Sequence, residues 1–136
     1  MKKLFIATTL ASIAGIQIAH AADTAAVTER LNEYQTQGAA DFSAERGDQM
    51  WHQNFPDPEG GPAQNCTTCH GTDLNLQGKH ARTGKIIEPM ARSVNPERLT
   101  DGKKIEKWFL RNCKSVLNRE CTPQEKGDFL RYLSSK

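Results

Sequence analysis

The stretch Cys66-Thr67-Thr68-Cys69-His70 decides how the rest of this chain is interpreted. It has the pattern C-x-x-C-H, in which two thiols form thioether bonds to the vinyl groups of a porphyrin. The adjacent imidazole then coordinates the iron from one side. The motif therefore predicts one covalently attached haem c, held by Cys66, Cys69 and His70.

A C-x-x-C pair also occurs in thioredoxin-like redox proteins and in zinc sites. The redox use requires a βαβ context, and the chain has no run of β-branched residues typical of strands. The zinc use requires a second pair of ligands at motif spacing, which the other cysteines, Cys113 and Cys121, do not supply. The sequence context therefore favours haem attachment.

The first 21 residues have the organisation of a secretory signal peptide. Lys2 and Lys3 precede an apolar run from 4 to 18, and Ala19-His20-Ala21 has the A-x-A form of a cleavage site. The run is short and contains Thr, Ser and Gln, which disfavours a membrane span, and an uncleaved anchor is the alternative. Because haem c is attached outside the cytoplasm, export predicts a periplasmic protein.

Cleavage after Ala21 leaves residues 22–136, which we expect to form one monohaem cytochrome c domain. Without Lys2 and Lys3, basic and acidic side chains number 16 each, so the exported chain is near neutral. No basic cluster contains interleaved aromatic residues, so nothing indicates nucleic acid as a partner. The hydrophobic content of 37% includes the leader, and a buried haem would supply much of the missing core.

Cys113 and Cys121 are the cysteines that remain once the haem motif is assigned. In an oxidising compartment, two cysteines close in sequence favour a disulfide bond. Two reduced, buried thiols are the alternative.

Apolar spacing and capping residues predict an all-α protein with the small monohaem cytochrome c fold. The helices are expected at 23–37, from Asp41 to Phe55, from Thr100 or Asp101 to Val116, and from Pro123 onward. A glycine inside a helix costs about 1 kcal/mol, so Gly47 indicates close contact with another helix. Residues 71–91 lack periodicity and predict a loop over one haem edge, whose basic residues either meet the haem propionates or are solvated.

One polar residue falls on the apolar face of the helix that ends near Val116. Ile105, Trp108 and Phe109 follow the i, i+3, i+4 spacing, and the next position of that template is Asn112. A buried amide without a partner costs a few kcal/mol, so the template predicts a partner for Asn112. The ordinary partner would be the helix backbone, which the amide would cap. The functional partner would be a haem iron or the ligand bound to it.

The iron ligand opposite His70 decides the function. The candidates are Met50, His52, His80, Met90 and Asn112. Met90 follows Pro89 in a loop downstream of the motif, an arrangement typical of class I electron-transfer cytochromes. His80 would give a bis-histidine haem. Met50 and His52 precede the motif, where a structural or exposed role is expected.

From about Ala44 to Leu133 the chain resembles the sphaeroides haem protein (SHP) family of monohaem cytochromes c. The matching segments are Glu45-Arg46-Gly47, Cys66-Thr67-Thr68-Cys69-His70-Gly71, Arg82-Thr83-Gly84-Lys85, Glu106-Lys107-Trp108, Arg111-Asn112-Cys113, Ser115-Val116 and Cys121-Thr122-Pro123. The resemblance implies that Asn112 is the distal iron ligand and that a disulfide joins Cys113 and Cys121. Met90 stands where the family pattern has leucine, so a methionine ligand stays open.

The resemblance further implies binding of oxygen or nitric oxide, with electrons supplied by a di-haem cytochrome or a membrane cytochrome b. An amide oxygen suits ferric iron better than ferrous iron, so we expect Asn112 to leave on reduction, with Trp108 limiting the pocket. Three function classes stay open. They are a terminal reductase of oxygen, nitrogen oxides or hydroxylamine, a ligand sensor or carrier, and a plain electron shuttle that uses Met90.

Overall fold

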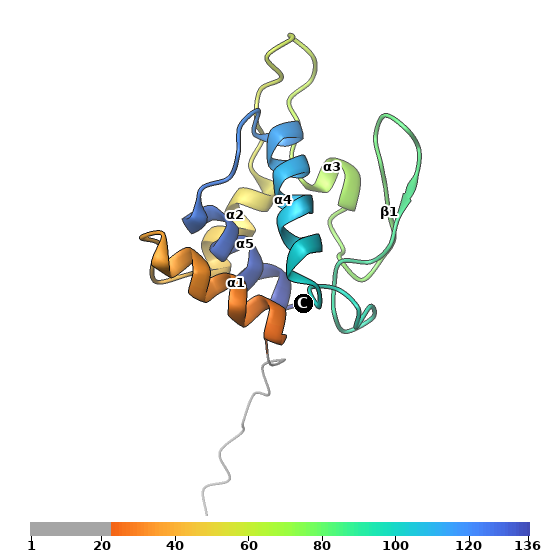
Figure 1. Cartoon of the computed structure of the whole chain (residues 1–136). Helices are drawn as coiled ribbons and strands as arrows, with labels where there is room; N and C mark the ends of the chain where they lie inside the picture. Colours follow the sequence, from red (N-terminus) through yellow and green to blue (C-terminus); the bar gives the residue numbers. More distant parts are fainter. Residues whose placement is uncertain (1–22) are drawn as a thin grey trace, which may run out of the picture.

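The computed structural model describes residues 23–136, which form a helical structure with one short hairpin (Figure 1). The elements are α1 (Ala25–Thr36), α2 (Ala44–His52), α3 (Thr67–His70), β1 (Gly78–Lys79), β2 (Ile86–Ile87), α4 (Gly102–Val116) and α5 (Pro123–Ser134). The predicted all-α class is confirmed. The predicted signal peptide and its cleavage site lie outside the described residues. No helix within 23–136 has both the length and the apolar content needed to cross a membrane.

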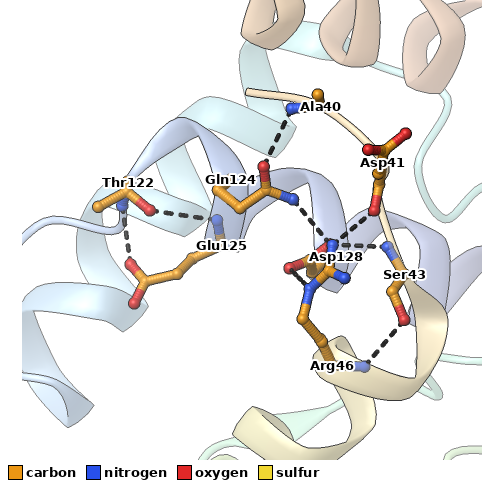
Figure 2. Close-up of polar contacts among 8 residues, drawn as sticks. All are labelled: Ala40, Asp41, Ser43, Arg46, Thr122, Gln124, Glu125 and Asp128. Carbon is orange, nitrogen blue, oxygen red and sulfur yellow. Dashed lines mark hydrogen bonds and ion pairs between the residues drawn. The ribbon is translucent and has the colours of Figure 1, made fainter. Parts of the chain in front are cut away.

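The helix starts follow from side-chain caps that satisfy free backbone N–H groups. The hydroxyl of Ser43 accepts a hydrogen bond from the backbone N–H of Arg46, and the carboxylate of Asp101 accepts two at the start of α4. At α5, the Thr122 hydroxyl and the Glu125 carboxylate form a capping box (Figure 2). The four long helices therefore begin close to where the sequence predicts.

Helix α2 is shorter than the predicted Asp41–Phe55 segment. Asp41 has a φ of 49°, a left-handed conformation that does not continue into a helix, so α2 begins after Ser43. At the other end Phe55 precedes Pro56 and instead pairs with Gln64 in an isolated antiparallel bridge. A residue before proline is disfavoured in the helical conformation, so Phe55 is excluded from α2, which ends at His52.

Helices α2 and α5 make the most extensive helix–helix contact of the described chain, and Gly47 lies at that contact. A Cβ atom at Gly47 would lie 2.7 Å from the Asp128 carbonyl carbon and from Tyr132 Cβ, so the predicted close approach is confirmed. Beside it, the buried Asp128 carboxylate accepts hydrogen bonds from Arg46 Nε and Nη2, both at 2.8 Å, and from Ser43 N at 2.7 Å (Figure 2).

The buried side chains form two clusters, and each cluster includes residues of both α4 and α5. The first cluster contains Trp51, Leu74, Ala91, Cys113, Leu117, Cys121, Phe129, Tyr132 and Leu133. The second contains Ala26, Val27, Leu31, Tyr34, Ala39, Ile105 and Leu130 and holds α1 against the other helices. Leu99 and Phe109 pack against both clusters, so the described helices form one continuous core.

The segment 71–91 differs from the predicted irregular loop because it contains an antiparallel hairpin. Gly78 pairs with Ile87, and Lys79 pairs with Ile86. The turn between the strands is closed by backbone bonds from His80 N to Lys85 O and from Gly84 N to His80 O, both at 2.8 Å. Two-residue strands are too short to give an alternating pattern, so the sequence carries little signal for them.

Candidate haem site

The C-x-x-C-H motif folds as the single helical turn α3, which presents both thiols and the imidazole. The backbone N–H of Cys66 donates to Trp51 O at 3.2 Å, which ties the start of the motif to the end of α2. The Asn65 side-chain oxygen accepts from the Thr68 N–H at 3.0 Å and so caps the turn. His70 N donates to Cys66 O at 3.1 Å, which places the imidazole one turn beyond the first thiol.

His70 is held in the form that binds a metal. Burial, and secondarily the nearby charge of Arg98, lowers the pKa of His70 to about 4, so the imidazole is neutral near pH 7. Its ring packs against Trp51 with centroids 5.2 Å apart. Its Nδ1 atom is buried and has no hydrogen-bond partner within residues 23–136. A neutral imidazole held by ring packing is suited to coordinate iron through its other nitrogen.

The two thiols are free, which is the state that haem attachment requires. Neither Cys66 nor Cys69 takes part in a disulfide. Burial raises the pKa of the Cys66 thiol to about 12, and Cys69 Sγ accepts a hydrogen bond from Ala81 N at 3.3 Å. Two unpaired thiols and a neutral imidazole on one helical turn fit a covalent haem c.

Strand β1 lies directly against this turn. A Cβ atom at Gly78 would lie 2.9 Å from His70 Cα and 3.2 Å from the Cys69 carbonyl carbon. A residue with a side chain would push the hairpin away from the motif, so glycine is required for this approach. The hairpin therefore forms one wall beside the haem-attachment turn.

Aromatic contacts connect the motif with α4. Trp51, which packs on His70, also contacts Phe129 edge-on at 6.3 Å, and Phe129 contacts Phe109 at 6.2 Å between ring centroids. Phe109 lies one residue after Trp108 on α4. The motif and the helix that carries Asn112 therefore rest on the same core cluster.

The predicted burial of Asn112 is wrong. Asn112 is exposed, and its side chain makes no hydrogen bond within residues 23–136. It is not a cap either, because α4 continues to Val116 and its C-cap is Leu117. The buried stripe of α4 runs through positions four residues apart, Ile105, Phe109, Cys113 and Leu117, of which Phe109 is partly buried. Asn112 lies on the edge of that stripe rather than within it.

Trp108 lies one turn before Asn112 and is 48% exposed. Lys107 Nζ and Arg111 Cζ lie 5.8 and 5.7 Å from the centroid of its ring. Trp108 and Asn112 are four residues apart on α4, so they share one face of the helix. This face combines a large aromatic surface with a free carboxamide.

The other candidate iron ligands differ in their burial and in their hydrogen bonds. His52 is exposed, with its Nδ1 atom 3.0 Å from Asp48 O, and His80 Nδ1 accepts from Thr83 N at 3.2 Å. Met50 and Met90 are partly buried against the first core cluster. Among the methionines, Met90 has its backbone fixed by a bond from its N–H to Leu74 O at 3.0 Å.

Cys113 and Cys121 are joined as a disulfide in the structure, with a Cα–Cα distance of 5.6 Å. Cys113 immediately follows Asn112 in α4, and Cys121 immediately precedes Thr122, the N-cap of α5. The bond therefore links the end of the Asn112 helix to the start of the last helix.

Sequence reasoning missed Trp51 and Arg98. The Trp51 indole Nε1 is buried without a hydrogen-bond partner within residues 23–136, and its ring contacts His70. Arg98 Nε donates to Pro89 O at 2.8 Å, so the guanidinium holds the segment before Met90. The burial of Trp51 could have been suspected from the sequence, because Trp51 follows Gly47 by one turn and lies on the same face of the helix. Arg98 has no such sequence signal, because its partners are backbone carbonyls.

The helical core and the single C-x-x-C-H turn with free thiols define a small c-type cytochrome with one covalently bound haem. Residues 37–133 match the family described as "Domain of unknown function (DUF1924)", so the chain is a member of it. The chain is 43% identical over 105 residues to cytochrome c-type protein SHP from Cereibacter sphaeroides, covering 76% of this chain and 78% of that protein. The chain therefore belongs to the SHP family of monohaem cytochromes c.

Solved structures agree with this assignment. The fold is similar to oxidised SHP, described as an oxygen-binding cytochrome c, with a TM-score of 0.72 and 40% identity over 85% of this chain and all of that one. Oxidised cytochrome c'' from Methylophilus methylotrophus gives a TM-score of 0.69 and 30% identity, covering 82% of this chain and 94% of that one. In sequence, cytochrome c'' is 38% identical over 84 residues, covering 62% of this chain and 58% of that protein.

Proposed function

We propose that this protein is a periplasmic cytochrome c that accepts an electron and then binds a small ligand, such as oxygen or nitric oxide, at a site gated by Asn112. The observation that carries the proposal is the likeness to oxidised SHP, which is described as oxygen-binding. The free carboxamide of Asn112 on α4 supports it. Cys66, Cys69 and His70 would hold the haem, which would supply a one-electron redox centre and an iron able to take a further ligand.

Asn112 acts as a ligand that depends on oxidation state. Its carboxamide oxygen is a hard donor that suits ferric iron and binds the softer ferrous iron poorly. No side chain within residues 23–136 holds the amide by a hydrogen bond, so nothing there competes with its binding or its release. After release, the amide N–H is available to donate to a diatomic ligand, and Trp108 limits the size of the pocket.

The alternative function is plain electron transfer with Met90 as the sixth ligand. One observation favours it: the backbone of Met90 is fixed to Leu74, and Arg98 holds the preceding Pro89, which would position a thioether firmly. A thioether binds both oxidation states of iron. Such a protein would show no ligand binding after reduction.

The setting of the proposed function is the periplasm, and the expected signal peptide and the Cys113–Cys121 disulfide support export. The electron would come from a di-haem cytochrome or a membrane cytochrome b, as the SHP resemblance implies. Turnover as a terminal reductase of oxygen, nitrogen oxides or hydroxylamine is the enzymatic form of this proposal. Steady consumption of one of these substrates with a reductant would separate an enzyme from a carrier.

The deciding experiment is an absorption spectrum of the ferric and ferrous protein, with and without carbon monoxide. We expect a ferric spectrum without the charge-transfer band of sulfur ligation, and a ferrous form that binds carbon monoxide. A low-spin ferric spectrum with that band would assign Met90. A ferrous form that stays six-coordinate and does not bind carbon monoxide would refute gating.

Replacing Asn112 by Ala should leave the ferric iron five-coordinate or water-ligated, because the substitution removes the proposed ligand. The change is read in the ferric absorption and electron paramagnetic resonance spectra. Asn32→Ala, at an exposed position on α1, is the matched control and should change neither spectrum. An unchanged ferric spectrum in Asn112→Ala, combined with a changed one in Met90→Leu, would assign the ligand to Met90.

A further inference from the structure

The hairpin between β1 and β2 carries a concentrated positive charge. Lys79, Arg82 and Lys85 are exposed, and no acidic residue lies between Gln77 and Ile87. The exported chain as a whole is near neutral, so this charge is local. Within residues 23–136, none of the three cations takes part in an ion pair.

The nearest acidic residue after the hairpin forms no ion pair with its cations within residues 23–136. Glu88 follows β2, and both of its carboxylate oxygens accept from Gln77 Nε2, at 3.3 and 3.2 Å. From Gln77 to Glu88 the chain therefore carries three exposed cations and one carboxylate, which leaves a local excess of positive charge.

Apolar side chains lie beside these charges. Ile86 is 53% exposed and pairs across the hairpin with Lys79, and Leu76, just before β1, is 63% exposed. Exposed apolar side chains bordered by unpaired cations form a surface suited to a partner with an acidic rim. We call residues 76–86 the basic hairpin.

The basic hairpin is in direct contact with the haem-attachment turn. Ala81 N donates to Cys69 Sγ at 3.3 Å, and Gly78 leaves no room for a side chain between β1 and the turn. Because Cys69 carries the haem, a partner seated on the hairpin approaches the redox centre through few intervening atoms. The turn that presents Arg82 is also ordered, since Thr83 N donates to His80 Nδ1 at 3.2 Å.

We propose that the basic hairpin is the docking surface for an acidic redox protein that delivers the electron to this cytochrome. One electron leaves the reduced centre of the partner, and the ferric iron of this protein becomes ferrous. No proton or other group passes between the two proteins. The proposal rests on the proposed function only in requiring that the haem is reduced by another protein.

The test uses the haem-loaded protein and two reductants of opposite charge, flavodoxin hydroquinone, a strongly acidic redox protein, and the methyl viologen radical cation. Stopped-flow absorption gives the rate of haem reduction by each. The charge-reversal variant is Arg82→Glu/Lys85→Glu. The matched control is Lys103→Glu/Lys104→Glu, which changes the net charge equally on the exposed start of α4.

We expect the hairpin variant to be reduced by flavodoxin at least about tenfold more slowly than wild type, because electrostatic steering is lost. The control should change less than about threefold, and methyl viologen should reduce the hairpin variant at least as fast as wild type. Rising salt should slow the reaction of wild type with flavodoxin.

An equal loss in both variants would assign the effect to net charge and overturn the proposal, as would an unchanged rate in the hairpin variant. Slower reduction by both reductants together with a shifted midpoint potential would assign these cations to the haem propionates, which also overturns it. Carbon monoxide binding by the same ferrous samples tests the Asn112 gate separately, so the two proposals fail independently.

Discussion

At position 47 there is no room for a side chain, because α2 and α5 touch there through backbone atoms. The space is closed by the Asp128 carbonyl and by Tyr132 Cβ, neither of which can move without moving α5. The contact also places Trp51, one turn later on α2, against His70. One glycine therefore fixes the distance between two helices and the position of the ring behind the haem motif.

Gly47→Ala should lower the free energy of unfolding by about 1–3 kcal/mol, the usual cost of adding a methyl group to a packed core. Gly102→Ala is the control, because its Cβ would lie 3.3 Å from the end of the flexible Arg30 side chain. That change should stay within about 1 kcal/mol of wild type. Denaturant unfolding of the oxidised protein measures both, and equal effects would contradict the contact described for Gly47.

At the same scale, Asn112 shows where the periodicity argument for α4 is wrong. The template anchored at Ile105 places Asn112 inside the apolar stripe, whereas the stripe follows Cys113 and Leu117 instead. The amide is exposed at the stripe's edge, so its need for a buried partner is not the reason for its presence. The proposed reason is iron coordination, which the ferric and ferrous spectra test.

At the scale of elements, the contact between α2 and α5 is reinforced by one ion pair. Asp128 is 2% exposed, whereas the side chain of its partner Arg46 is 48% exposed. Removal of one side chain therefore has a different effect from removal of the other. Loss of Arg46 leaves a buried carboxylate without its cation, whereas loss of Asp128 leaves a guanidinium that water can reach.

Arg46→Ala should lower the free energy of unfolding by about 3 kcal/mol, because an uncompensated buried carboxylate remains. Glu45→Ala is the adjacent exposed control and should stay within about 0.5 kcal/mol of wild type. Chemical denaturation at pH 7 measures both variants. A loss for Arg46→Ala no larger than the control's would show that the pair contributes little to holding α2 on α5.

The Cys113–Cys121 bond joins α4 to α5 beside Asn112, and we expect it to set how readily the Asn112 helix moves. Cys113→Ala/Cys121→Ala should lower the free energy of unfolding by about 2–3 kcal/mol, the value that chain entropy gives for so short a loop. It should also speed carbon monoxide binding to the ferrous protein, which flash photolysis measures.

Thiol titration of the denatured, unreduced wild type tests the bond itself and should find no free thiol. Two free thiols would show that the disulfide does not form in solution. If the variant binds carbon monoxide at the wild-type rate, the disulfide does not control how readily Asn112 moves.

For the whole molecule, acid should destabilise the fold. Hydrogen bonding to Arg119 lowers the pKa of Glu125 below its ordinary value of 4.5, and backbone hydrogen bonds lower the pKa of Asp101 and Asp73 below 3.8. The folded state therefore binds these protons less tightly than the unfolded state. The stability they provide is complete above about pH 4.5 and is lost as pH falls through the folded pKa values.

Thermal unfolding between pH 7 and pH 3 should show this loss. Glu125→Gln should be less stable than wild type by about 1 kcal/mol at pH 7, because the pair with Arg119 is removed. The difference between the two proteins should shrink as pH falls through the lowered folded-state pKa of Glu125, because the wild-type carboxyl then becomes protonated. A difference that does not shrink as the solution is acidified would show that the Glu125 charge is not its cause.

The amino-acid sequence alone was sufficient to predict an all-α fold and a covalently bound haem c. C-x-x-C-H is a local covalent motif, so it needs no tertiary information, and the caps at Ser43, Asp101 and Thr122 act within one turn. The covalent haem and the approximate helix starts could therefore be predicted, although α2 begins at Ala44 rather than at Asp41. The family resemblance likewise rests on short segments that keep their spacing along the chain.

Tertiary packing determined which surfaces meet. The contact of Trp51 with His70, the hold of Arg98 on Pro89 and the position of the basic hairpin against Cys69 join residues from separate segments. Such contacts leave no periodic pattern, because they depend on how the helices and the hairpin pack rather than on spacing within one element. For the same reason, the exposure of Asn112 depended on tertiary packing. The first core cluster covers the side of α4 that carries Phe109 and Cys113, and it leaves Asn112 exposed.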